Sequence, residues 1–89
     1  MSILKDDIMT KNESLFRPEQ CRAGRALLNW SQAELAKRAR VAKQTLADFE
    51  RGARSPYPRT LADIREALEA AGAEFTNGDA PGVRLRQRK

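Results

Sequence analysis

The chain has 89 residues, and its 17 Lys and Arg residues outnumber 12 Asp and Glu residues, which gives a net charge of +5. This length predicts a single domain, small enough that dimerisation would add to its stability. The single cysteine, Cys21, excludes an internal disulfide and is typical of the reducing cytoplasm, and no apolar run approaches a membrane span. Ten basic and four acidic residues fall between residues 17 and 59. This excess suits a polyanionic partner, although charge alone favours the simpler interpretation of a solvated basic surface.

The first predicted elements are an N-terminal arm and a helix. Residues 1–16 mix charges with a few apolar residues and show no sustained period, so we expect a flexible arm that packs on the domain or contacts a partner. Pro18 suits a first helical position, and the helix that follows is predicted to end at Asn29, which tolerates the left-handed conformation. Cys21 lies on the apolar face of this helix and is expected to be a small buried residue, and Trp30 is expected to turn into the core.

Two short helices are predicted next, joined by a turn of about four residues. Ser31 is a good N-cap with Glu34 as its capping-box partner, and apolar residues then recur at helical spacing as far as Ala39. The period restarts after Val41, and Gly52 stands where a left-handed stop is expected. This pattern is typical of a helix-turn-helix whose second helix reads DNA.

The remaining elements are a loop, a helix and a hairpin. Residues 53–58 contain two prolines and predict a loop, and the apolar spacing from Thr60 to Ala71 predicts a further helix. Residues 73–76 and 83–86 both alternate apolar and polar side chains around a turn rich in Gly and Asn, which predicts a small β-hairpin.

These elements define a mainly α fold of four to five short helices with a helix-turn-helix, followed by a C-terminal β-hairpin. The expected organisation is a flexible arm over residues 1–16, a helix-turn-helix DNA-binding domain over residues 17–72, and a hairpin with a basic tail over residues 73–89. Together with the helix from Thr60 to Ala71, the hairpin and tail are expected to form the dimerisation surface, because this region is acidic or apolar and lies clear of DNA.

Residues 18–72 resemble the lambda repressor, Cro and Xre type of helix-turn-helix domain. The resemblance rests on the Ser-Gln-Ala-Glu-Leu-Ala segment that begins at Ser31 and on the Phe-Glu-Arg-Gly segment that ends at Gly52. The closing hairpin segments are also similar to the tail of a bacterial subgroup of small Xre regulators. The resemblance implies a dimer of short helices that binds pseudo-palindromic operators.

The resemblance also implies roles for individual residues. In the second motif helix, the expected base-reading residues are Lys43, Gln44, Thr45 and Asp48. The expected phosphate contacts are Gln32, Arg51, Arg54 and Ser55. A cross-helix ion pair is expected between Arg25 and Glu50. The chemistry is consistent with base reading, because Gln can pair bidentately with adenine, Lys reaches guanine acceptors or phosphate, and the Thr methyl can pack on thymine.

Three positions leave alternatives or depart from the family pattern. Asp48 can accept a hydrogen bond from a cytosine amine or instead pair with Arg51 and hold it in place. Arg40 stands where the family usually has Gly, which predicts a left-handed non-glycine residue or an altered turn. Ala42 cannot cap the second helix, at a cost of roughly 1 kcal/mol of helix stability.

The function indicated is that of a homodimeric transcriptional regulator, either a repressor that occupies a promoter or also an activator if the acidic stretch Asp48 to Glu50 contacts RNA polymerase. It is expected in the cytoplasm with the nucleoid. The alternatives are an antitoxin-type protein that binds a toxin and its own promoter, a basic RNA-binding module, and a plain helical bundle. Tyr57 is the only obvious aromatic residue for RNA base stacking. With no histidine, no metal-ligand cluster, no glycine-rich phosphate loop and no nucleophile beside a base, neither catalysis nor a cofactor or metal is expected.

Overall fold

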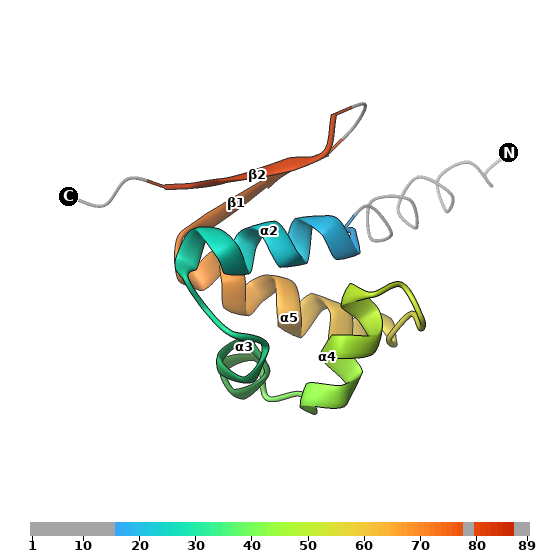
Figure 1. Ribbon diagram of the computed structural model, residues 1–89. Helices are drawn as coiled ribbons and strands as arrows, with labels where there is room; N and C mark the ends of the chain where they lie inside the picture. Colours follow the sequence, from blue (N-terminus) through green and yellow to red (C-terminus); the bar gives the residue numbers. More distant parts are fainter. Residues whose placement is uncertain (1–15, 78–79, 87–89) are drawn as a thin grey trace, which may run out of the picture.

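Four helices and one β-hairpin make up the part of the chain that the structure, a computed structural model, describes, namely residues 16–77 and 80–86 (Figure 1). In chain order, the elements are α2 (Pro18–Leu28), α3 (Gln32–Ala39), α4 (Lys43–Glu50), α5 (Pro58–Ala70), β1 (Ala73–Thr76) and β2 (Gly82–Leu85). The predicted fold class, a helix-turn-helix with a C-terminal hairpin, is confirmed. Of the arm predicted over residues 1–16, residues 1–15 lie outside the described residues, and so do residues 87–89 of the tail.

The bounds predicted for three segments were wrong by one or two residues. Helix α5 begins at Pro58 rather than Thr60, because Pro is favourable at a first helical position, where no backbone donor is needed. Strand β2 covers Gly82 to Leu85 rather than residues 83–86, since Gly82 pairs with Thr76 in the register of the hairpin. Phe16, assigned to the arm, is 4% exposed and belongs to the core.

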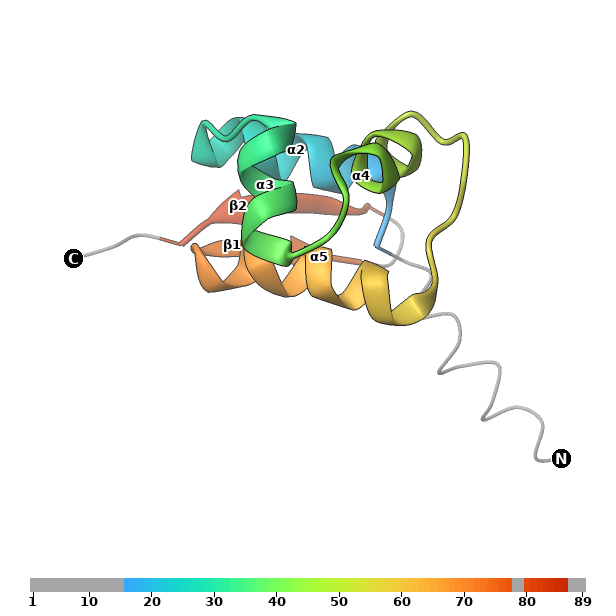
Figure 2. The same cartoon turned by 90° about the horizontal axis from the view of Figure 1, so that it is seen from below.

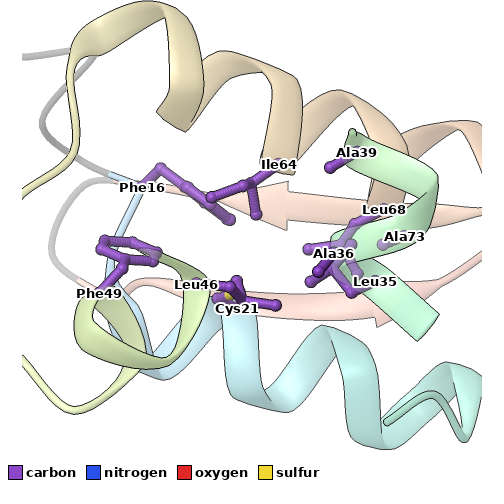
Figure 3. Packing of buried hydrophobic residues seen from close by; sticks show 10 residues of the cluster. All are labelled: Phe16, Cys21, Leu35, Ala36, Ala39, Leu46, Phe49, Ile64, Leu68 and Ala73. Atoms are coloured by element: carbon purple, nitrogen blue, oxygen red, sulfur yellow. The ribbon is translucent and has the colours of Figure 1, made fainter. Parts of the chain in front are cut away.

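The core lies where α2, α3, α4 and α5 meet the hairpin (Figure 3). Its ten buried apolar residues are Phe16, Cys21, Leu35, Ala36, Ala39, Leu46, Phe49, Ile64, Leu68 and Ala73. The ring of Phe16 packs at 5.8 Å from that of Phe49 and edge-on at 5.0 Å from that of Phe75, so one residue joins α4 to β1. This cluster fixes the two motif helices against a common base.

The hairpin is anchored on α2 by a buried polar side chain. The Nε2 group of Gln20 donates hydrogen bonds to the carbonyl oxygens of Thr76 (2.8 Å) and Gly82 (3.0 Å), one in each strand. Its Oε1 atom accepts from the backbone N–H of Arg17 (2.9 Å). Because an isolated two-stranded hairpin is marginal in water, these bonds and the apolar contacts beneath them explain why the hairpin is ordered.

The hairpin and the motif helices lie on opposite sides of the domain. In Figure 1, β1 and β2 lie above α2, whereas α3 and α4 form the lower part of the molecule with α5 behind them. Seen from below in Figure 2, α3 and α4 are in front and the strands lie behind them. The surface presented by α4 therefore faces away from the hairpin.

Candidate DNA interface

The turn between α3 and α4 is built by local hydrogen bonds. The Ser31 hydroxyl accepts from the Glu34 N–H (3.0 Å) and caps α3, while the Glu34 carboxylate pairs with Arg38 (2.6 Å) one turn further along the helix. At the other end, Arg40 adopts the left-handed conformation with φ 62°. The N–H of Val41 donates to the carbonyl of Ala36 (3.0 Å), which satisfies a helix-end acceptor. Of the two outcomes expected at this position, the turn thus shows the left-handed non-glycine residue.

The first turn of helix α4 carries two exposed side chains and one half-buried side chain. No side chain caps it, because Ala42 is the N-cap residue. Lys43 and Gln44 are exposed, and Thr45 is half-buried. On the opposite face, Leu46 and Phe49 are buried in the core. The first turn of α4 therefore presents one cation and one amide to a partner, with the Thr45 hydroxyl and methyl beside them.

A hydrogen-bonded group runs along the exposed face of α4. Gln44 Nε2 donates to Asp48 Oδ1 (2.9 Å), and the guanidinium of Arg51 donates to the same oxygen (2.6 Å). The hydrogen bond from Gln44 lowers the pKa of Asp48, as does that from Arg51, and together they outweigh the desolvation that raises it. Asp48 is therefore ionised at neutral pH, with its charge balanced by Arg51, which is the second of the two roles predicted for it.

Glu50 is the centre of a buried network that joins three helices. Its Oε1 accepts from Arg25 (2.7 Å) and from Gln32 Nε2 (3.0 Å). Its Oε2 accepts from Arg25 Nε (2.8 Å) and from the Cys21 thiol (3.0 Å). The predicted pair of Arg25 and Glu50 is thus a two-bond contact between α2 and α4, and Gln32 adds α3. Sequence reasoning missed two partners, Cys21 and Arg22, the latter of which donates to the backbone carbonyl of Glu50.

The network sets the ionisation of its members. Burial acts to raise the pKa of Glu50, but hydrogen bonds from Arg25, Gln32 and Cys21 outweigh it and hold that pKa below its usual value. Burial, with the hydrogen bond to the Glu50 carboxylate second, raises the pKa of the Cys21 thiol far above its ordinary value. Cys21 is fully buried, as its position on the apolar face predicted, and it also donates to Glu50, which the sequence did not predict. Glu50 is 2% exposed, so the acidic stretch predicted for polymerase contact offers only Asp48 at the surface.

The predicted phosphate contacts lie in two places. Gln32 is the first residue of α3, and its amide donates to Glu50 rather than projecting freely from the helix. Arg51, Arg54 and Ser55 are exposed after the end of α4. The chain is held there by the backbone N–H groups of Ala53 and Arg54, which donate to the Asp48 carbonyl (2.9 and 3.3 Å). The structure thus brings the exposed side chains of Lys43 and Gln44 to one end of α4 and those of Arg51 and Arg54 to the other.

Helices α3 and α4 are short and are joined by a tight turn, and the first residues of α4 are exposed to solvent. This arrangement defines a helix-turn-helix domain of the kind found in DNA-binding regulators. The sequence matches the helix-turn-helix family over residues 22–75, and the chain belongs to this family, of the lambda repressor and Xre type. It is therefore a DNA-binding regulator. No curated protein matches the sequence significantly.

Within residues 16–77 and 80–86, His, Cys, Asp and Glu side chains do not gather into a group of three that could hold a metal ion. None of the four helices is long and apolar enough to cross a membrane.

Proposed function

We propose that the protein is a sequence-specific transcriptional regulator that represses by occupying its operator, and that it is not an enzyme. The observation that carries this proposal is the exposed first turn of α4, where Lys43 and Gln44 stand on a helix held from behind by Leu46 and Phe49. Lys43 reaches guanine acceptors or phosphate, Gln44 pairs with a base edge, and the Thr45 methyl packs on thymine. Arg51, Arg54 and Ser55 bind phosphates and fix the register of the helix on the duplex.

Gln32 contributes to phosphate binding in a more restricted way than the sequence indicated. One N–H of its amide is used by Glu50, so the contact to phosphate comes from the second N–H or from the backbone N–H groups at the start of α3. The Glu50 network therefore connects the phosphate anchor on α3 with the end of the reading helix.

The regulator acts as a homodimer in this proposal, with two copies of α4 in successive major grooves about 34 Å apart. Two large apolar side chains support a pairing surface on the hairpin and α2, namely Leu27 (45% exposed) and Leu85 (42% exposed). We expect them to lie at the same level, because β2 runs in the same direction as α2 (Figure 1) and begins at Gly82, whose carbonyl is bonded to Gln20. From this bond, the three residues to Leu85 along β2 and the seven residues to Leu27 along α2 each cover about 10 Å.

The open edge of β2 adjoins these leucines. The Arg86 N–H donates to the Gly72 carbonyl (2.8 Å), and bonding alternates along an antiparallel pair, so the backbone polar groups of Val83 and Leu85 point away from β1. Antiparallel pairing with β2 of a second copy would use these groups. The two-fold axis would then be normal to the sheet, which directs both α4 helices to the side opposite the hairpin, as one DNA duplex requires. Helix α5, the other predicted contributor, contains none of the large exposed apolar residues of the described chain.

Sedimentation equilibrium tests the dimer with a matched pair of variants. Leu85→Asp places a charge on the proposed surface, and Ala62→Asp places the same charge on the exposed face of α5. We expect a concentration-dependent dimer for the native chain and for Ala62→Asp, and a monomer for Leu85→Asp. A native monomer contradicts the homodimer, and a loss of dimer only in Ala62→Asp assigns pairing to α5.

Selection of bound sequences from random DNA at two salt concentrations tests the function itself. Enrichment of an inverted repeat with half-sites one helical turn apart is the expected result, and affinity should fall with salt. Salt-sensitive binding without an enriched sequence would contradict specific regulation and favour a partner protein, as in the antitoxin alternative.

A further inference from the structure

The partly exposed carboxylate of Asp48 determines which polar atoms of Gln44 remain available to a partner. An ionised carboxylate is only an acceptor, so the hydrogen bond between these side chains (2.9 Å) must use the amide nitrogen of Gln44. One of the two N–H groups is therefore committed to Asp48. The other N–H and the carbonyl oxygen of Gln44 remain for a base, in one fixed orientation.

Asp48 is itself held in place. Arg51 donates to the same oxygen (2.6 Å), and the carboxylate side chain is 18% exposed. Gln44 and Asp48 lie one turn apart on α4, and Arg51 follows directly after the helix, so the orientation of the Gln44 amide depends on Asp48 and Arg51 together. The cation also offsets the negative charge that would otherwise oppose a phosphate backbone.

The atoms that remain on Gln44 match one base. Adenine presents a donor, N6–H, and an acceptor, N7, in the major groove, which pair with one carbonyl oxygen and one N–H. Guanine presents two acceptors, N7 and O6, so the fixed amide would place its oxygen against O6. Without Asp48 the amide turns over freely and can offer its N–H groups to guanine.

We propose that Asp48 is a specificity-determining positioning residue, which fixes the Gln44 amide for adenine and against guanine at one position of each half-site. The inference rests on the proposed reading role of α4. This role of Asp48 differs from both roles that the sequence suggested, which were contact with a cytosine amine and pairing with Arg51.

The test is a binding competition between operators that carry adenine or guanine at the base pair whose preference disappears in Gln44→Ala. For the native protein we expect adenine to be preferred by about tenfold or more, the range of one bidentate pair. In Asp48→Ala the preference should fall to about threefold or less through stronger binding of the guanine operator. Adding Asp48→Ala to Gln44→Ala should cause no change beyond that of Gln44→Ala alone, because both substitutions act through one amide.

Asp63→Ala is the matched control, because it removes an equal charge that pairs with Arg59 on α5, a helix outside the proposed reading face. It should leave the adenine preference intact. An unchanged preference in Asp48→Ala, or a native preference for guanine at this position, overturns the inference and leaves the proposed function standing. Native binding without any base preference overturns both.

Discussion

Two carboxylates on α4 stand two residues apart and have opposite surroundings. Glu50 is buried and accepts four side-chain hydrogen bonds from residues of α2 and α3, whereas Asp48 lies on the surface and bonds only to neighbours on its own helix or directly after it. Glu50 fixes the position of α4 against α2 and α3, and Asp48 fixes the orientation of the Gln44 amide on the surface of α4. The helix thus separates stability from recognition by the direction in which each side chain points.

The most disruptive way to test this contrast is Glu50→Ala. It leaves the guanidinium of Arg25 without its carboxylate in a largely buried site, so we expect the free energy of unfolding to fall by about 3 kcal/mol or more. Urea unfolding followed by circular dichroism measures the loss. Asp48→Ala is the comparison variant and should leave the unfolding midpoint almost unchanged. Equal losses in the two variants would contradict the division of roles.

Substitutions at the DNA-facing residues should change the free energy of DNA binding by less than Glu50→Ala changes that of unfolding. Gln44→Ala should cost roughly 1–3 kcal/mol on the preferred operator and little on random DNA, because it removes a base contact. Arg54→Ala should weaken binding to both DNAs about equally, since a phosphate contact carries no sequence information. Titration of labelled duplexes measures both. If the two variants lose the same affinity on both DNAs, Gln44 is not a base reader.

Lowering the pH tests the role of the Glu50 carboxylate in stability without removing its side chain. The pKa of Glu50 is lowered in the folded protein, so its contribution to stability is present above its ordinary value of 4.5 and is lost as pH falls through the folded pKa. Unfolding free energies between pH 7 and pH 3 should therefore decline at the acid end. In Glu50→Gln this decline should be shallower, and an unchanged pH profile would argue that the carboxylate is not stabilised by the network.

Signals carried by single residues made much of the fold predictable from the sequence. Ser31 caps α3, Arg40 and Gly52 adopt the left-handed conformations that the motif requires, and Asn29 ends α2. Each of these features depends on the backbone within a few residues of the signal, which is why spacing and residue type sufficed.

The features that the sequence did not predict depend on residues far apart in the chain. Phe16 is in the core because Phe49 and Phe75 surround it, and no local pattern distinguishes it from the arm. The pairing of Arg25 with Glu50 was implied by resemblance, whereas the donors from Cys21 and Arg22 follow only from the packing of α2 on α4. The DNA-contact roles of the reading and phosphate-binding residues stay predictions until binding is measured.

The double hydrogen bond of Gln20 bears on how the domain folds as it is synthesised. Its two acceptors lie 56 and 62 residues further along the chain, so α2 gains them only after Gly82 has left the ribosome. Contacts of such long range form after local ones, because closing a long loop costs more entropy. The reading helices can therefore form on the nascent chain, but the domain is completed only when the hairpin docks.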